Sequence, residues 1–203
     1  MSTKDTLAEL LREHGRSYAE EAGITLRDKP SPLYQLLVLA VLCSTRIKAD
    51  IAVDAARELF RTRLRTARAM ADTDWQTIVD ALGRAHYRRY DESTATALLE
   101  GAEVLLRRWH GDLRRLRDEA AGDPQVVREL LQEVPRIGPV GAGIFCREAQ
   151  GIWPELRPSF DDRARESATA LGLPSTPEGL ARLVPPEELP RLASALVRSS
   201  LEH

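Results

Sequence analysis

Helical patterns fill this sequence, and no segment shows the strict alternation of apolar and polar residues that marks a half-buried strand. Asn-Gly and Asp-Gly, the dipeptides typical of tight β-hairpins, do not occur. Several apolar segments instead begin with a polar residue followed by proline, which is typical of a helix start. The sequence therefore predicts an all-α fold of about ten helices joined by short loops.

The most apolar segment of the chain predicts a central helix. Ser31 is expected to cap this helix, Pro32 lies in its first turn, and it runs to about Ser44. Because the segment is hydrophobic on all sides, we expect it to lie in the core. The other main helices are expected at about 4–14, 48–60, 74–82, 91–109, 124–133, 139–150, 161–171, 176 onward and 185–198.

The charge composition restricts the kinds of partner. Charged residues make up 30% of the 203 residues, but the formal net charge is only −2. This balance argues against a protein covered in basic charge, so any contact with a polyanion must come from a local patch. Nearly all the cations are arginines, whose planar fork suits phosphate, and lysine occurs only at Lys4, Lys29 and Lys48.

The two cysteines, Cys43 and Cys146, lie within apolar helical patterns and are expected to be buried small side chains. Two cysteines without a C-x-x-C motif cannot hold a four-iron cluster. No apolar run reaches membrane-spanning length, and the charged N-terminus differs from a signal peptide, so we expect a cytoplasmic protein. The last three residues, Leu201, Glu202 and His203, resemble the start of an expression tag.

A tight glycine-containing turn joins two apolar helical patterns between Val134 and Gly141. Gly138 is expected to adopt a positive φ, and the helix that starts at Pro139 is expected to present N–H groups near Val140 and Gly141. Such donors, together with the helix dipole, form an anion site suited to a phosphate. The alternative is an ordinary helix–helix turn with a glycine stop and a proline start.

This stretch resembles the helix-hairpin-helix DNA glycosylase superfamily, of the endonuclease III type. The superfamily's hairpin L-P-G-V-G is matched by VPRIG at 134–138. Its Gly-Trp-Pro-like stretch is matched by GIWP at 151–154, and its apolar residue and essential aspartate by Phe160-Asp161. The order of elements upstream is also similar, so that the resemblance covers about 30–171.

The resemblance implies a chain of two helical lobes. One lobe is a helical barrel at 30–133, closed by the hairpin at 134–141. The second lobe pairs residues 1–29 with 142–200, and residues 201–203 are left out of it.

Two departures from the superfamily bear on the chemistry. Bifunctional members carry a lysine nucleophile two residues after the second hairpin glycine, and this chain has Val140 there. Valine cannot form a Schiff base, so the resemblance implies a monofunctional glycosylase or a member without catalysis. The first hairpin glycine is replaced by Arg136, which could add a phosphate contact or change the turn.

Asp161 occupies the position of the essential aspartate, at the start of a predicted helix. In a monofunctional glycosylase, the resemblance implies that this carboxylate activates water or stabilises the oxocarbenium-like sugar as the base leaves. The alternative from the residues alone is a helix N-cap, a role that aspartate performs well. The neighbouring Asp162 is expected to be a first-turn charge that complements the helix dipole.

The resemblance also implies that two loops and the hairpin contact DNA. Arg46 lies where the superfamily often places a polar wedge, and His86 and Tyr87 lie in a basic loop where they could stack on bases. The alternative for this loop is an exposed basic surface with partly buried aromatic rings. The predicted DNA-binding residues are Arg46, His86, Tyr87, Arg136, Ile137, Gly138, Val140 and Gly141.

The sequence thus predicts a DNA repair N-glycosylase of base excision repair, which hydrolyses the N-glycosidic bond of a damaged or mispaired base in double-stranded DNA. It is expected to act as a monomer, with no iron–sulfur cluster and no protein-bound metal except a monovalent cation at the hairpin. One alternative is a non-catalytic DNA-binding protein of the same fold. Another is an enzyme that uses the fold for a different substrate.

Overall fold

The computed structural model of the chain describes residues 2–201, and within them it contains helices and no β-strand. The all-α fold is confirmed. The described chain divides into two compact units. Residues Ala22–Phe145 form the larger unit, and the segments up to Glu21 and from Cys146 onward form the smaller one. The sequence predicts these boundaries at residues 30 and 142; the last two residues of the suspected tag lie outside the described range.

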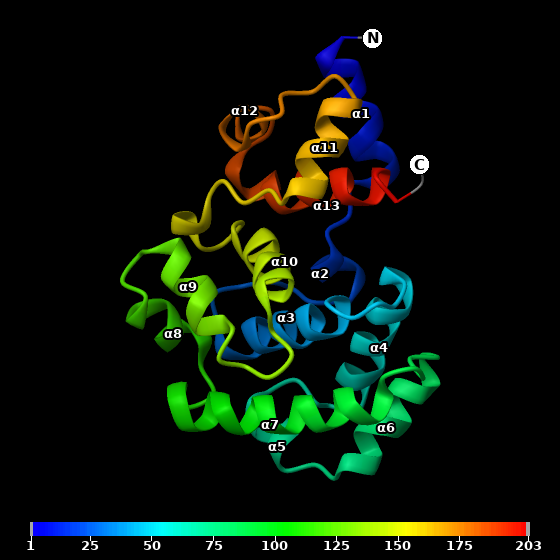
Figure 1. The fold of residues 1–203 in the computed structure, drawn as a ribbon, viewed down its shortest axis with the longest axis vertical. Coiled ribbons are helices and arrows are strands. Elements are labelled where there is room, and N and C mark those ends of the chain that lie inside the picture. Colours follow the sequence, from blue (N-terminus) through cyan, green and yellow to red (C-terminus); the bar gives the residue numbers. More distant parts are fainter. Residues whose placement is uncertain (1, 202–203) are drawn as a thin grey trace. The chain divides into compact units, whose positions relative to one another are not determined.

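The larger unit is built around α3 (Figure 1). Nine of the 14 residues of this helix are buried, which agrees with its predicted place in the core. Helix α4 packs on α3, α6 packs on α4, and α7 packs on both α5 and α6. The helices of this unit are α3 (Pro30–Cys43), α4 (Ala49–Arg61), α5 (Ala67–Ala71), α6 (Trp75–Arg84), α7 (Asp91–Trp109), α8 (Leu113–Glu119), α9 (Pro124–Leu131) and the first part of α10 (Pro139–Ala149).

The start of α3 differs from the prediction. The helix begins at Pro30, and Lys29 is its N-cap residue without a capping side-chain bond. Ser31 is therefore not the cap; its hydroxyl donates to the carbonyl of Arg65 over 2.9 Å. Proline at the first helical position needs no N–H acceptor, which explains why the helix can begin at Pro30, two residues earlier than a cap at Ser31 predicts.

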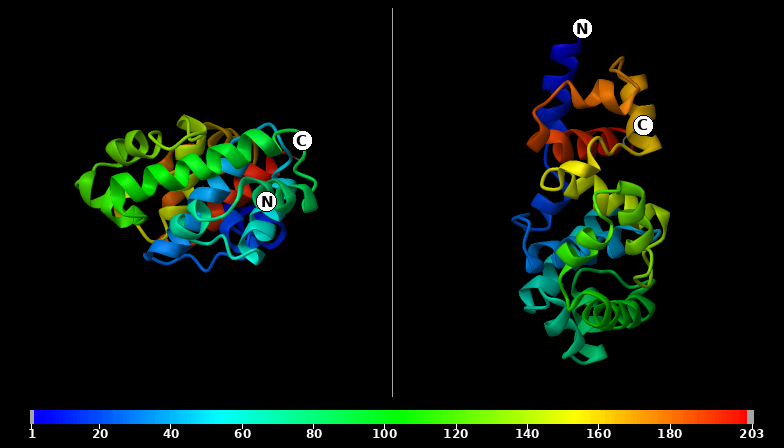
Figure 2. Two further views of the ribbon diagram at one scale, coloured as in Figure 1. Left: turned by 90° about the horizontal axis from the view of Figure 1, so that it is seen from below. Right: turned by 90° about the vertical axis from the view of Figure 1, so that its left-hand side faces the viewer.

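Helix α7 has the predicted limits and crosses the larger unit as one long helix (Figures 1 and 2). Asp91 and Glu92 lie in its first turn and Arg107 and Arg108 in its last, where each sign of charge complements the helix dipole. The C-cap residue, His110, adopts the left-handed conformation with φ 54° and ends the helix.

The smaller unit is built around α13, against which α1 and α11 pack. Nine of the 11 residues of α13 are buried. A capping box at Ser2 and Asp5 begins α1, because each residue bonds the backbone of the other. The helices of this unit are α1 (Thr3–His14), α2 (Tyr18–Glu21), the end of α10, α11 (Asp162–Ala170), α12 (Pro177–Ala181), α13 (Leu189–Ser199) and the short 3-10 helices η1 (Pro154–Leu156) and η2 (Pro186–Glu188).

The described residues form more helices than the sequence predicts, and the additional helices are short. Helices α2, α5 and α8 are four, five and seven residues long and were not among those expected from the sequence. A helix of this length has too few turns for apolar residues to show a period, and packing rather than propensity stabilises it.

Candidate functional site

The predicted hairpin is present in the larger unit, between α9 and α10. The Ile137 N–H donates to the carbonyl of Val134 over 3.0 Å, and the Ile137 side chain is buried. Gly141 packs against this side chain so closely that a Cβ there would lie 3.2 Å from Ile137 Cδ1. Ile137 and Gly141 are both buried and therefore build the turn from the inside.

The left-handed residue of the hairpin is Arg136, with φ 69°. Gly138 does not have a positive φ, so the expectation for this glycine is wrong. The turn therefore has its left-handed conformation at a residue that carries a Cβ. A non-glycine residue in this region costs on the order of 1 kcal/mol or more.

The first turn of α10 leaves two N–H groups without a helical acceptor. The first helical bond at this end joins the Ala142 N–H to the Gly138 carbonyl over 2.9 Å. The N–H groups of Val140 and Gly141 precede it and have no acceptor within the helix. A Cβ at Gly138 would meet no atom within 4 Å, and the Val140 side chain is 67% exposed. The space beside Gly138 and the Val140 side chain are therefore open, whereas Gly141 is buried.

The predicted wedge loop follows α3 and lies beside the hairpin. The Ser44 hydroxyl donates to the Val41 carbonyl over 2.8 Å and lies 3.4 Å from the Arg136 carbonyl oxygen. Arg46, two residues later, is exposed. The structure thus brings two predicted DNA-binding residues, Arg46 and Arg136, to neighbouring loops of the same unit.

The basic loop after α6 differs from its prediction in one residue. His86 is exposed and has a positive φ of 61°, as expected for a residue at a loop tip. Tyr87 is fully buried, so its ring cannot stack on a base, and that prediction is wrong. The Tyr87 hydroxyl instead lies 2.8 Å from Thr45 Oγ1. Burial raises the pKa of the Tyr87 phenol, while the Thr45 and Thr94 hydrogen bonds and the Arg136 charge oppose this shift.

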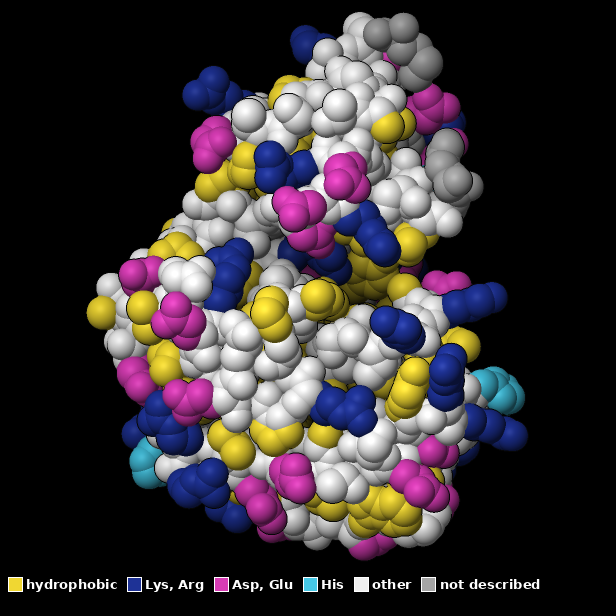
Figure 3. All heavy atoms as spheres, in the orientation of Figure 1, with side chains coloured by type: hydrophobic (Ala, Val, Ile, Leu, Met, Phe, Trp, Pro, Cys, Tyr) yellow, Lys and Arg dark blue, Asp and Glu magenta, His cyan; other side chains and the backbone are white. Residues whose placement is uncertain are grey.

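A shallow open depression lies at this end of the larger unit, and Figure 3 shows Lys, Arg and His side chains gathering there. Its lining mixes both signs of charge. Arg84 is held by Glu58, with 3.0 Å between Nε and Oε2, whereas no ion pair of Arg88 is found among the described residues. The residues that line the depression are Val79, Asp80, Gly83, Arg84, His86, Arg88 and Asp91.

Asp161 lies in the smaller unit, where it caps α11. Its Oδ1 accepts the Ala164 N–H over 2.8 Å, and its Oδ2 accepts from Arg147 Nη1 over 3.1 Å. The Asp161 side chain is 40% exposed and that of Arg147 only 6%. The cap expected from the sequence is therefore present, and it is combined with an ion pair to a nearly buried arginine.

Arg147 belongs to a buried polar cluster that the sequence did not predict. Its guanidinium stacks over the Tyr18 ring at 5.2 Å, and its Nε is buried without a hydrogen-bond partner. The next residue, Glu148, is fully buried and accepts three hydrogen bonds. These come from the N–H groups of Tyr18 and Ala19, at 3.3 and 3.1 Å, and from the Ser194 hydroxyl at 2.8 Å.

The sequence carried one signal for this cluster. The segment CREAQ at 146–150 places charged residues in a helix whose other residues are mostly apolar, and all five are buried. Charged residues are rarely fully buried unless they are paired. Their position near the end of an apolar helix could have indicated a polar cluster, although not its partners.

Potential ligands for a metal do not gather in this structure. Among residues 2–201, no three His, Cys, Asp or Glu side chains are placed to hold an ion. Cys146 is fully buried, as expected, and Cys43 is partly buried near the end of α3. No helix in the described part of the chain has the length and hydrophobicity needed to cross a membrane.

Two solved structures are similar in fold to this chain. One is a trapped covalent intermediate of endonuclease III with DNA, an estranged-adenine complex, with a TM-score of 0.57 and 16% sequence identity. The other is a non-covalent endonuclease III–DNA complex, with a TM-score of 0.57 and 17% identity. Each alignment covers 97% of this chain and 85% of the other. The chain has the endonuclease III fold.

The sequence comparisons add no closer relative. No protein-family model matches the chain. The search of curated proteins also found no match.

Proposed function

We propose that this chain binds double-stranded DNA and hydrolyses the N-glycosidic bond of a damaged or mispaired base, as the first step of base excision repair. The observation that carries the proposal is the hairpin. It combines N–H groups without helical acceptors at the start of α10 with an exposed arginine, within a fold similar to that of a DNA glycosylase. We further propose that the protein acts as a monomer in the cytoplasm.

The larger unit supports the DNA-binding part of the proposal. The Val140 and Gly141 N–H groups are suited to a backbone phosphate, and Arg136 adds a positive charge at the same turn. Arg46 and His86 are exposed on the two other loops. Contacts of this kind position a duplex without reading its sequence, which suits an enzyme that searches for a lesion.

Asp161 is the proposed catalytic residue. A carboxylate oxygen can accept two hydrogen bonds, so the bonds from Ala164 and Arg147 still leave acceptor positions on the exposed part of Asp161. Held in this fixed orientation, the carboxylate can stabilise the positive sugar that forms as the base leaves. Water then attacks the sugar. Because Val140 stands at the lysine position, we propose that the enzyme is monofunctional.

The proposal needs neither a metal nor an iron–sulfur cluster. A monovalent cation at the hairpin remains a prediction from the resemblance. The hairpin fits such an ion poorly: the Val134 carbonyl accepts the Ile137 N–H, the Arg136 carbonyl faces the Ser44 hydroxyl, and the Arg136 side chain brings a positive charge. No step of the proposed reaction depends on the ion.

One observation favours a second candidate, a non-catalytic DNA-binding protein. Asp161 is both a helix cap and the partner of a nearly buried arginine, and these two roles are sufficient to explain an aspartate at this position. In that case the chain would bind DNA through the hairpin and leave every base in place.

The two candidates are separated by incubating the protein with duplex oligonucleotides that carry a panel of damaged and mispaired bases. Strand breaks are measured with and without hot alkali, which cleaves only where a base has been removed. We expect breaks with one lesion after alkali, and none without it. Asp161→Asn is expected to lower base release at least 100-fold, within the range for a catalytic group. Asp162→Asn, which changes the adjacent exposed carboxylate, is the matched control.

If the Asp161→Asn variant released the base at the wild-type rate, Asp161 would be ruled out as the catalyst. Tight binding without any base release would favour the non-catalytic candidate. A Val140→Lys variant tests whether Val140 occupies the position of the lysine nucleophile. We expect borohydride to trap this variant covalently on DNA that contains an abasic site, and not to trap the wild type. Trapping of the wild type would contradict the monofunctional proposal.

A further inference from the structure

We propose that the hydroxyls of Thr94, Tyr87 and Thr45 form a buried chain of hydrogen bonds that positions the Arg46 loop for insertion into DNA. Tyr87 is then a positioning residue, not a residue that touches a base. This inference rests on the proposed DNA binding. All three hydroxyls lie in the larger unit, on α7, on the loop after α6 and on the loop after α3.

The direction of the hydrogen bonds follows from counting protons. Thr45 has one hydroxyl proton, and it donates this proton to the Leu42 carbonyl over 3.0 Å. The 2.8 Å contact between Thr45 and Tyr87 therefore has Tyr87 as its donor. Since the Tyr87 proton is then in use, Thr94 is the donor in the longer 3.5 Å contact with Tyr87. The chain ends at a backbone carbonyl of α3.

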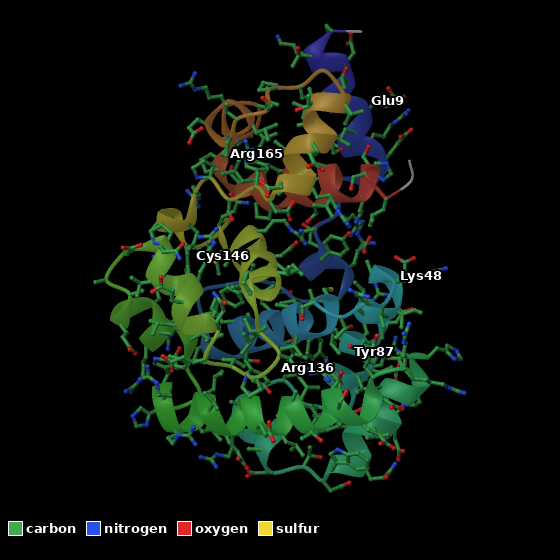
Figure 4. The ribbon with its side chains drawn as sticks, viewed as in Figure 1. Glu9, Lys48, Tyr87, Arg136, Cys146 and Arg165 are labelled. Atoms are coloured by element: carbon green, nitrogen blue, oxygen red, sulfur yellow. The ribbon has the colours of Figure 1, made fainter. Side chains whose placement is uncertain are left out.

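Burial fixes this chain in place. Tyr87 and Thr94 are both fully buried, so their hydroxyls cannot exchange these partners for water without opening the unit. Figure 4 shows Tyr87 and Arg136 in the same unit. The Ser44 hydroxyl, next to Thr45, lies 3.4 Å from the Arg136 carbonyl oxygen, so the hairpin is close to the end of the hydroxyl chain.

The loop that carries Arg46 is thus held from two directions. Ser44 faces the Arg136 carbonyl of the hairpin, and Thr45 receives the Tyr87 hydroxyl. Arg46 follows directly and projects from the surface. A loop that is ordered before binding loses less conformational entropy when its side chain enters the duplex. The hydroxyl chain therefore lowers the cost of inserting Arg46 without touching the DNA.

The test compares Tyr87→Phe with Tyr34→Phe. Both tyrosines are buried in the larger unit, but no hydrogen bond of the Tyr34 hydroxyl is found within residues 2–201. Backbone hydrogen exchange is measured first, on the protein without DNA. Tyr87→Phe is expected to speed exchange at residues 44–48 about fivefold, the factor for one neutral hydrogen bond, and Tyr34→Phe to leave it unchanged. Equal exchange in the two variants would overturn the proposal.

The second measurement uses a duplex that contains 2-aminopurine, whose fluorescence rises when the base leaves the stack. At saturating protein, Tyr87→Phe and Thr45→Val are each expected to reduce the fraction of extruded base about fivefold. The double variant is expected to be no worse than either single one, because both changes break the same bond. Thr45→Ser, which keeps the hydroxyl, is expected to retain the wild-type signal.

The outcomes separate this inference from the proposed function. Faster exchange at 44–48 with unchanged extrusion in Tyr87→Phe would overturn the positioning role. If wild-type protein neither binds nor extrudes the base, the proposed function fails, whereas the exchange result still decides whether the hydroxyl chain orders the loop. Additive losses in the double variant would count against a shared bond.

Discussion

The hairpin region of the larger unit and the Asp161 region of the smaller unit use their polar groups in opposite ways. At the hairpin, the Val140 and Gly141 N–H groups lack helical acceptors, and Arg136 and Arg46 are exposed. Around Asp161, Arg147 and Glu148 are buried and bonded to groups of their own unit. The hairpin region has polar groups available to bind a ligand, whereas most polar groups of the Asp161 region form hydrogen bonds within the smaller unit.

A motif match therefore does not establish whether the side chain or backbone of a residue is free to bind a ligand. The sequence resemblance predicts a site residue at both Asp161 and Gly138. Yet Gly138 faces open space, whereas both carboxylate oxygens of Asp161 already accept a hydrogen bond. We therefore expect changes at Arg147 and Glu148 to act mainly on stability, and changes at the hairpin to act mainly on DNA binding.

The largest effect on stability is expected from Glu148→Ala. The change leaves two backbone N–H groups and the Ser194 hydroxyl without an acceptor in a fully buried position, at a cost of about 3–5 kcal/mol in the free energy of unfolding. Urea unfolding measures the loss, with the exposed Glu9→Ala on α1 as control. Equal midpoints for the two variants would show that the buried cluster does not stabilise the unit.

A smaller loss is expected from Arg147→Met. Methionine replaces the apolar stem of the arginine, but Asp161 loses its charged partner, which we expect to cost about 1–2 kcal/mol because Asp161 is partly exposed and water can replace the bond. Arg163→Met, on the exposed side of α11, is expected to change the unfolding free energy by less than about 0.5 kcal/mol. A cost near zero for Arg147→Met would mean that the ion pair contributes nothing.

Arg136→Gly is expected to move stability and DNA binding in opposite directions. Glycine removes the strain of the left-handed conformation, so the free energy of unfolding should rise by about 0.5–1 kcal/mol. The variant also loses a phosphate contact, so the slope of log affinity against log salt concentration should fall by about 0.9.

The matched control for Arg136 is Arg63→Gly. Arg63 is also an exposed arginine with a positive φ, 66°, but it lies in the turn after α4. We expect the same gain in stability with an unchanged salt slope. A loss of stability in Arg136→Gly would mean that the arginine side chain holds the hairpin together, and equal salt slopes would remove Arg136 from the DNA interface.

The smallest effect is expected from two arginines of the basic loop. The hydrogen bond from Arg84 is the main reason that the pKa of Glu58 lies below its ordinary value of 4.5. The resulting stabilisation is present above pH 4.5 and is lost as the pH falls through the lowered pKa of the folded state. Arg84→Gln should therefore reduce stability at neutral pH by only a few tenths of a kcal/mol, about the value of an exposed pair.

Arg88→Gln completes that comparison. Arg88 is exposed and makes no ion pair among the described residues, so we expect its loss to lower DNA affinity at neutral pH and to leave unfolding between pH 3 and 7 unchanged. Thermal unfolding across this pH range and binding titrations on the same samples measure both effects. If Arg84→Gln and Arg88→Gln changed stability and DNA affinity in the same way, the two arginines would not have separate roles in folding and in binding.

Local sequence patterns were sufficient to predict the helical class, the main helices and the hairpin. Helix α7 has the predicted limits and Asp161 caps α11 as expected, because caps and amphipathic periods act over a few neighbouring residues. The short helices α2, α5 and α8 were missed because they depend on packing for their stability.

Which site residues can meet a ligand depends instead on long-range contacts. Tyr87 and Thr45 are 42 positions apart and Arg147 and Asp161 are 14 apart, so no local pattern indicates that each pair shares a hydrogen bond. A tyrosine among arginines suits an exposed loop as well as a buried anchor, because its ring is apolar and its hydroxyl polar. Burial and pairing depend on groups brought together from distant segments, and these contacts decide whether a side chain serves the fold or remains open to DNA.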